Sequence, residues 1–154
     1  MMRYLALKYP ENLQQWYPKD DLATRAKIDE YLDFHHLNTR NCANLIFNTL
    51  FAKKLGVENP NFNPEEAKKM VASALKNFTR HYLQKKKFIM GENPTIADLA
   101  AFFEIQFLYL VKEDFGKYPE IVQWMMRMSE IPEVRKANGA FIKLISKVNP
   151  AAKF

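Results

Sequence analysis

The side chains best suited to chemistry in this sequence are three histidines and a single cysteine: His35, His36, His81 and Cys42. A zinc site or a Cys–His nucleophile needs such side chains at ligand spacing, with a carboxylate or a second histidine close by. No second histidine follows His36 four residues on, no carboxylate is nearby, and Cys42 points to another helix face. We therefore expect no metal site and no catalytic residue here, and we expect Cys42 to be a small core residue.

A stripe of polar side chains beside an aromatic ring is the second candidate. His36, Arg40, Asn44 and Phe47 are spaced by about one helical turn each and share one helix face. The simplest interpretation of Arg40 is an arginine at a helix interface, paired with an aspartate or glutamate. The spacing alone assigns the stripe no ligand.

Asp98 could be taken for a catalytic acid, but its position explains it as a helix cap. Thr95 and Asp98 have the spacing of a capping box, in which each side chain bonds the backbone amide of the other residue. The residues that follow, up to Val111, are apolar on nearly every side. A helix of this kind is normally buried. We therefore predict the central helix of a bundle, with Thr95 and Asp98 as its structural cap.

The rest of the chain also predicts helices. Helix-starting and helix-ending residues, such as Asn63 with Pro64, Gly56 and Pro119, separate apolar stripes of helical period. The predicted helices cover residues 1–9, 20 or 21–55, 64–86, 95–111, 119–128, 132–137 and 139–148, the first being only the tail of a helix and the sixth a single turn. The expected fold class is all-α, a single bundle of five or six helices without a sheet.

Composition limits the function classes. The chain has 154 residues, 48% of them apolar, and only four glycines, which suits one compact domain. The net charge of +6 is spread out, and its one tight run lies at a helix end (residues 85–87), so we expect no nucleic-acid partner. The apolar stretch after Thr95 is too short and too often interrupted to span a membrane, so no membrane insertion is expected. A lone cysteine and the absence of a visible signal peptide favour the cytoplasm.

Three motifs in order resemble the C-terminal helical domain of glutathione transferases, the theta class most of all. The first combines Trp16-Tyr17-Pro18 and residues 25–32 with His36, Asn38 and Arg40. The second combines residues 88–91 and 95–99 with Glu104, and the third is Tyr118-Pro119 with Trp124 and Pro132. In addition, residues 2–9 resemble the end of the last helix of the thioredoxin-like domain that precedes the helical domain in this family.

The resemblance implies a division of the chain into a remnant of a thioredoxin-like domain helix (residues 1–10), a linker (residues 11–19) and the helical domain (residues 20–154). It implies that Tyr4, Trp16 and Tyr17 would pack on a thioredoxin-like domain and would otherwise form an exposed apolar interface patch. It also implies that the stripe His36, Arg40, Asn44 and Phe47 lines the ligand cleft. Arg40 matches an arginine near the family's substrate site, where it could attract an anionic or polarised ligand.

Two functions follow as expectations. In the first, the chain is a non-catalytic protein-binding or assembly module, with another protein or a second copy as partner. In the second, it is the substrate-pocket half of a theta-like transferase that conjugates glutathione to electrophiles. We place the first ahead because no serine, tyrosine or cysteine here is positioned to activate a thiol, so that the chain alone is expected to be inactive. In the family, the thioredoxin-like domain binds glutathione, and we therefore expect glutathione as a substrate only where such a domain is supplied, and no cofactor in this chain.

Overall fold

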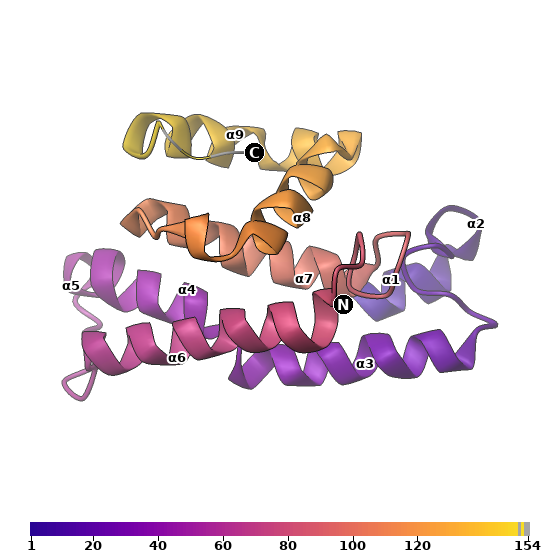
Figure 1. The fold of residues 1–154 in the computed structure, drawn as a ribbon, viewed down its shortest axis with the longest axis horizontal. Helices are drawn as coiled ribbons and strands as arrows, with labels where there is room; N and C mark the ends of the chain where they lie inside the picture. The colour runs from indigo at the N-terminus through magenta and orange to yellow at the C-terminus, as the bar shows by residue number, and fades with distance from the viewer. Residues whose placement is uncertain (151, 153–154) are drawn as a thin grey trace.

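The computed structural model describes residues 1–150 and residue 152, and its elements in this part are helical (Figure 1). No strand occurs among these residues, apart from an isolated bridge between Phe88 and Gly91. The expected all-α fold class is therefore confirmed. The α helices are α1 (Met2–Lys8), α2 (Pro10–Leu13), α3 (Leu22–Leu37), α4 (Asn41–Ile46), α5 (Ala52–Leu55), α6 (Pro64–Asn77), α7 (Ile96–Ile105), α8 (Pro119–Glu130) and α9 (Pro132–Val148). Two π-helical segments, η1 (Phe47–Phe51) and η2 (Phe78–Leu83), and two 3₁₀ segments, η3 (Gln106–Val111) and η4 (Phe115–Lys117), adjoin them.

Helix α7 occupies the middle of the bundle. In Figure 1 it crosses the molecule between α3 and α6 below and α9 above. Ala97, Ala101, Phe102 and Ile105 are fully buried along it, as predicted for the central helix. The helix does not continue as an α-helix to Val111, however, because it tightens into the 3₁₀ segment η3 at Gln106. Such tightening is common in the last turns of a helix.

Asp98 is the polar centre of this core. Both halves of the predicted capping box are present, and the Thr95 amide donates to Asp98 Oδ2 over 2.9 Å. The Asp98 carboxylate also accepts from the Ile89 amide and from Trp124 Nε1, each over 2.9 Å. Burial raises the pKa of Asp98, while these donors act in the opposite direction. The cap therefore ties α7 to the preceding loop and to α8, which the sequence pattern did not reveal.

The long helix predicted to reach Leu55 is wrong in one respect, since α3 ends at Leu37 and α4 begins at Asn41. The buried side chain of Thr39 turns inward, where its hydroxyl lies 3.1 Å from Tyr31 Oη and 2.8 Å from His35 Nδ1. At the same place, the side-chain amides of Asn38 and Asn41 donate to the carbonyls of Phe34 and Leu37, each over 3.0 Å, and side chains that bond the backbone in this way compete with the helical pattern. The predicted end at Gly56 is confirmed by its left-handed φ of 67°.

The C-terminal helix is longer than predicted. The two separate pieces expected after Pro132 form one continuous helix, α9, which passes through Gly139. Its buried Asn138 donates to Gln106 Oε1 over 2.7 Å. Because this bond and the apolar face of α9 outweigh the modest cost of one glycine, the helix is not interrupted.

The segment predicted as a linker (residues 11–19) is docked onto the bundle and contains α2. The Trp16 carbonyl accepts from the Ile96 amide over 2.9 Å. Tyr17 is buried, and its hydroxyl donates to both carboxylate oxygens of Asp29 at 3.0 Å. The expectation that Tyr17 belongs to an exposed patch is therefore wrong, because Asp29 gives its hydroxyl a partner inside the domain. Tyr4 is 62% exposed, as that expectation requires.

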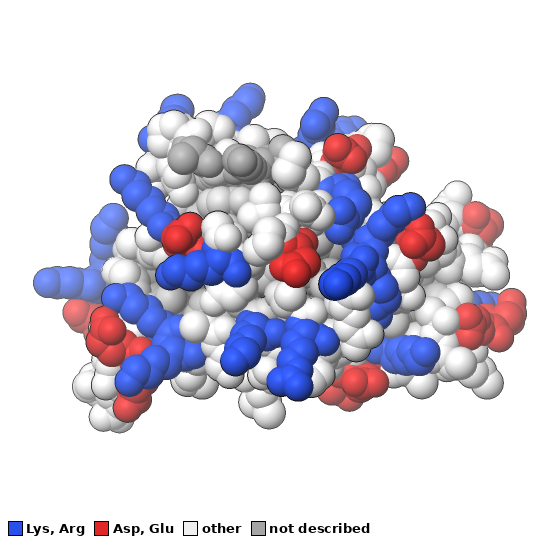
Figure 2. All heavy atoms as spheres, in the orientation of Figure 1, with Lys and Arg blue, Asp and Glu red and all other residues white. Residues whose placement is uncertain are grey.

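The charged side chains cover the surface without a single basic stripe on the face that Figure 2 shows, where acidic groups lie between the basic ones. Lys87 from the basic run pairs with Glu92 at 2.6 Å, and Lys86 Nζ donates to the Ile89 carbonyl. In the described part of the chain, no helix has the length and apolar character needed to cross a bilayer.

Candidate functional site

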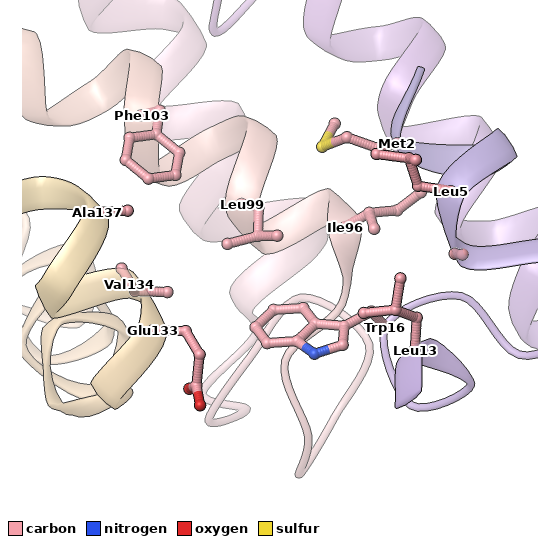
Figure 3. Close-up of a pocket in the computed structure, with 11 residues that line it drawn as sticks. Met2, Leu5, Leu13, Trp16, Ile96, Leu99, Phe103, Glu133, Val134 and Ala137 are labelled. Carbon is pink, nitrogen blue, oxygen red and sulfur yellow. The ribbon is translucent and has the colours of Figure 1, made fainter. Parts of the chain in front are cut away.

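An apolar groove of about 370 Å³ opens beside α7 (Figure 3). Its walls come from segments that are far apart in the sequence: α1, the residues after α2, the exposed side of α7 and the first turns of α9. Trp16 stands at its centre, opposite Leu99. The lining residues are Met2, Leu5, Ala6, Leu13, Trp16, Ile96, Leu99, Phe103, Val134 and Ala137, with Glu133 at the edge.

The groove offers binding surface and no catalytic group. Its one ionisable side chain, Glu133, belongs to an exposed residue. Leu5, which lines the groove, is 40% exposed. An exposed apolar surface is typical of a protein or ligand contact. Leu99 and Phe103 are thus only half covered within this chain.

The predicted stripe forms a second candidate surface, and all four of its residues are exposed. His36 lies in the last turn of α3, before the break at Thr39, whereas Arg40, Asn44 and Phe47 follow on successive turns after it. The Asn44 side chain accepts from Asn48 Nδ2 over 2.9 Å. The structure therefore keeps Arg40, Asn44 and Phe47 as an outward-facing row and separates His36 from them by the break.

Arg40 has a carboxylate beside it, as the simpler interpretation of Arg40 expects. Glu104 of α7 places Oε1 3.8 Å from Arg40 Nη1 and 3.6 Å from His35 Nε2. The Arg40 side chain is nevertheless 61% exposed, while that of Glu104 is only 16% exposed. The Arg40 guanidinium therefore has the acidic partner expected of an interface arginine, and its outer side is exposed to solvent. Arg40 and Glu104 are more than sixty positions apart in the sequence, so no local spacing could have predicted their contact.

The other candidate residues have structural positions. Cys42 is fully buried, and burial raises the pKa of its thiol, so that it is held as the unreactive neutral form. His35 is buried and bonded to Thr39, and His81 is exposed on η2. Among the described residues, no group of three or more histidine, cysteine, aspartate or glutamate side chains could hold a metal ion.

Sequence reasoning named Glu104 only as part of a motif and gave it no role, and it missed the groove. Glu104 is one of only two acidic residues in the apolar stretch that forms α7 and η3, and the other, Asp98, is the cap. A lone charge in a buried helix needs a partner, and this signal could have singled out Glu104. The groove had no comparable signal, because its walls come from four separate segments.

Comparison with known proteins identifies the family of this chain. Residues 42–132 match the model of the glutathione S-transferase C-terminal domain. Chicken glutathione S-transferase theta-1 is 33% identical over 133 residues, which are 84% of this chain and 50% of the relative. Arabidopsis glutathione S-transferase T1 is 31% identical over 133 residues, 79% of this chain and 53% of the relative. The chain thus spans about half the length of these relatives.

Solved structures agree with this family. Human glutathione transferase theta-2, solved in complex with glutathione, superposes with a TM-score of 0.77 at 23% identity, over 98% of this chain and 63% of that one. At this identity the likeness concerns the fold. Together with the family match over residues 42–132, it leads to one conclusion. This chain belongs to the glutathione S-transferase family and has the fold of its C-terminal, theta-like helical domain.

Proposed function

We propose that this chain is the substrate-binding helical half of a theta-like glutathione transferase, in which glutathione is conjugated to an electrophile. The observation that carries the proposal is the family match over residues 42–132, together with theta-class relatives that are about twice as long as the matched region. These comparisons support this function better than the assembly module that the sequence analysis placed first.

The apolar groove supports the proposal by offering a surface for the other half of such an enzyme. Its lining includes Trp16, which the resemblance already assigned to contact with a thioredoxin-like domain. Covering Leu99 and Phe103 would bury the half-exposed side of α7. Burial of apolar surface contributes about 25 cal/mol per Å², so covering this groove would favour association.

The row of Arg40, Asn44 and Phe47 supports the proposal as the surface for the electrophile. Phe47, 42% exposed, offers an apolar ring, and Arg40 offers a guanidinium with free donors on its outer side. An electrophile with an aromatic ring and an anionic or polarised leaving group suits this pair. In this proposal glutathione is bound by the thioredoxin-like domain, and no group of this chain activates its thiol.

A chimaera tests the function. The thioredoxin-like domain of chicken theta-1 is fused ahead of residue 2, and conjugation of glutathione is measured with alkyl halides and aryl sulfate esters. We expect turnover by the chimaera and none by either half alone. A chimaera that is folded by circular dichroism and binds glutathione, yet conjugates none of these electrophiles, would contradict the proposal and would favour a non-catalytic module.

The groove has its own control. Leu99→Glu places a charge on the apolar wall, whereas Leu144→Glu places the same charge on an exposed position of α9 outside the groove. We expect only Leu99→Glu to weaken association between this chain and a separately produced thioredoxin-like domain, measured by calorimetry. Light scattering of the wild-type chain then tells whether a second copy competes for the same surface. Equal effects of the two variants would remove the groove from the proposal.

A further inference from the structure

We propose that Glu104 is a positioning residue that holds the Arg40 guanidinium over the outward-facing row of Asn44 and Phe47. The inference rests on the proposed function for its ligand, an anionic aromatic compound, but its geometry stands on contacts within this chain. Arg40 Nη1 lies 3.8 Å from Glu104 Oε1, and helix α4, which begins directly after Arg40, packs against α7, which carries Glu104.

The Glu104 side chain is mostly buried, whereas that of Arg40 is mostly exposed. Glu104 belongs to the central helix, between the fully buried positions Phe102 and Ile105, and its side chain is 16% exposed. Its Oε2 is buried and has no hydrogen-bond partner among the described residues, and its Oε1 is the atom shared by His35 and Arg40. A buried carboxylate with an unused oxygen attracts a cation, and Arg40 is the one that can reach it from solvent.

A chain of hydrogen bonds through Tyr31 and Thr39 orients His35, which lies on the inner side of Glu104. His35 faces Glu104 with Nε2, and its other ring nitrogen lies 2.8 Å from Thr39 Oγ1, which in turn lies 3.1 Å from Tyr31 Oη. All three side chains are buried. The imidazole therefore has little freedom to turn away. Thr39 lies in the break between α3 and α4, and Arg40 follows it directly in the sequence.

Two opposing effects of Glu104 on an anionic ligand have to be compared. Its negative charge weakens the attraction of Arg40 for the anion, but Arg40 is mostly exposed and water screens this effect. The contact with Glu104 restricts the rotamers of the long Arg40 side chain before the ligand binds. Arg40 therefore loses less conformational entropy on binding. We therefore infer that orientation outweighs charge, so that loss of the Glu104 charge lowers affinity for the anion.

The first measurement needs no ligand. Order of each arginine Nε–Hε group is measured by ¹⁵N relaxation in the wild type and in Glu104→Gln. Arg3, paired with Asp29 at 2.6 Å, serves as the ordered standard, and Arg135, exposed and without an ion pair among the described residues, as the mobile one. We expect Arg40 to resemble Arg3 in the wild type and Arg135 in the variant. A wild-type Arg40 as mobile as Arg135 would overturn the inference.

The second measurement uses 1-naphthalenesulfonate as the probe, titrated into the 154-residue chain and followed by chemical shifts. We expect Glu104→Gln to weaken binding about two- to fivefold, the range of an exposed ion pair. Glu104→Asp keeps the charge and should recover part of the affinity, and Glu58→Gln, an exposed carboxylate outside both the row and the groove, should leave it unchanged. Affinity that is equal or higher in Glu104→Gln would overturn the positioning role.

Arg40→Ala separates this inference from the proposed function. If the probe binds Arg40→Ala as tightly as it binds the wild type, or if it binds neither protein, Arg40 is no ligand residue and that part of the proposed function fails. The relaxation data then still decide whether Glu104 positions Arg40. If Arg40→Ala loses binding and Glu104→Gln does not, the proposed function stands and the inference is refuted.

Discussion

Replacement of Asp98 by alanine is expected to bring the domain close to unfolding. The Asp98 carboxylate is fully buried and accepts from the amides of Ile89 and Thr95, from the Thr95 hydroxyl and from Trp124 Nε1, over 2.9–3.1 Å. Asp98→Ala would leave all four donors without this acceptor inside the core. A hydrogen bond to a charged group contributes about 1.5–3 kcal/mol, and a donor left buried and unpaired costs about 1–3 kcal/mol.

These losses are not additive, because the loop can relax and admit water once the carboxylate is gone. We therefore expect a decrease of about 4–6 kcal/mol in the free energy of unfolding, against a total of about 5–15 kcal/mol for a typical domain. Asp98→Asn keeps the shape of the side chain but turns one acceptor into a donor that faces another donor. For this variant we expect about 2–4 kcal/mol, with the fold retained.

Urea unfolding at pH 7, followed by far-UV circular dichroism, measures both variants. Asn63→Ala is the matched control, because Asn63 caps α6 through the amides of Glu65 and Glu66 on the protein surface. Loss of that exposed cap should cost about 1 kcal/mol. A loss for Asp98→Ala no larger than that for Asn63→Ala would refute the role of Asp98 as a buried hub and would leave it an ordinary cap.

Further expectations concern positions where the backbone or the burial is decisive. Gly56→Ala should lower the free energy of unfolding by about 1 kcal/mol because its φ is +67°, whereas Gly139→Ala, inside α9 with nothing near the added Cβ, should raise it by about 0.5–1 kcal/mol; urea unfolding checks both, and the same sign for the two would contradict the helix assignment. Native Cys42 should not react with an aromatic disulfide reagent until urea unfolds the chain, since burial raises the pKa of its thiol; prompt absorbance change in the native state would show an exposed cysteine. The pKa of Asp21 is lowered by its bonds from Thr24, so the folded chain should gain stability from this group above its unfolded pKa of about 3.8 and lose it as the pH falls through the folded pKa; the stability difference between the wild type and Asp21→Asn should shrink in acid, and a difference that grows there would reverse the assigned sign.

Much of the fold was predictable because its signals are local. The capping box of Thr95 and Asp98, the cap at Asn63 and the end at Gly56 each depend on residues within a few positions, and each is present in the structure. The break after α3 was not predictable in this way. Thr39 gives no stronger helix-breaking signal than other residues, and its inward turn depends on Tyr31 and His35 being there to receive its hydroxyl.

In the candidate site, too, the residues on one helix were predictable and the contacts between helices were not. The row of Arg40, Asn44 and Phe47 follows from helical spacing and remains on one exposed face. Its acidic partner, Glu104, comes from another helix, and nothing within the first helix indicates it. Tyr17 was expected in an exposed patch because the resemblance assigns it to contact with a thioredoxin-like domain, but its hydroxyl bonds the Asp29 carboxylate and the side chain is buried.

The sequence by itself determined the helical class, the buried central helix and most helix ends, because backbone hydrogen bonds, caps and apolar periodicity act over one or two turns. Only the tertiary structure decided that Asp98 joins three segments, that Glu104 lies beside Arg40 and that four segments wall an apolar groove. These contacts depend on how helices pack against one another. Packing brings together side chains whose distance along the chain carries no record of their distance in space.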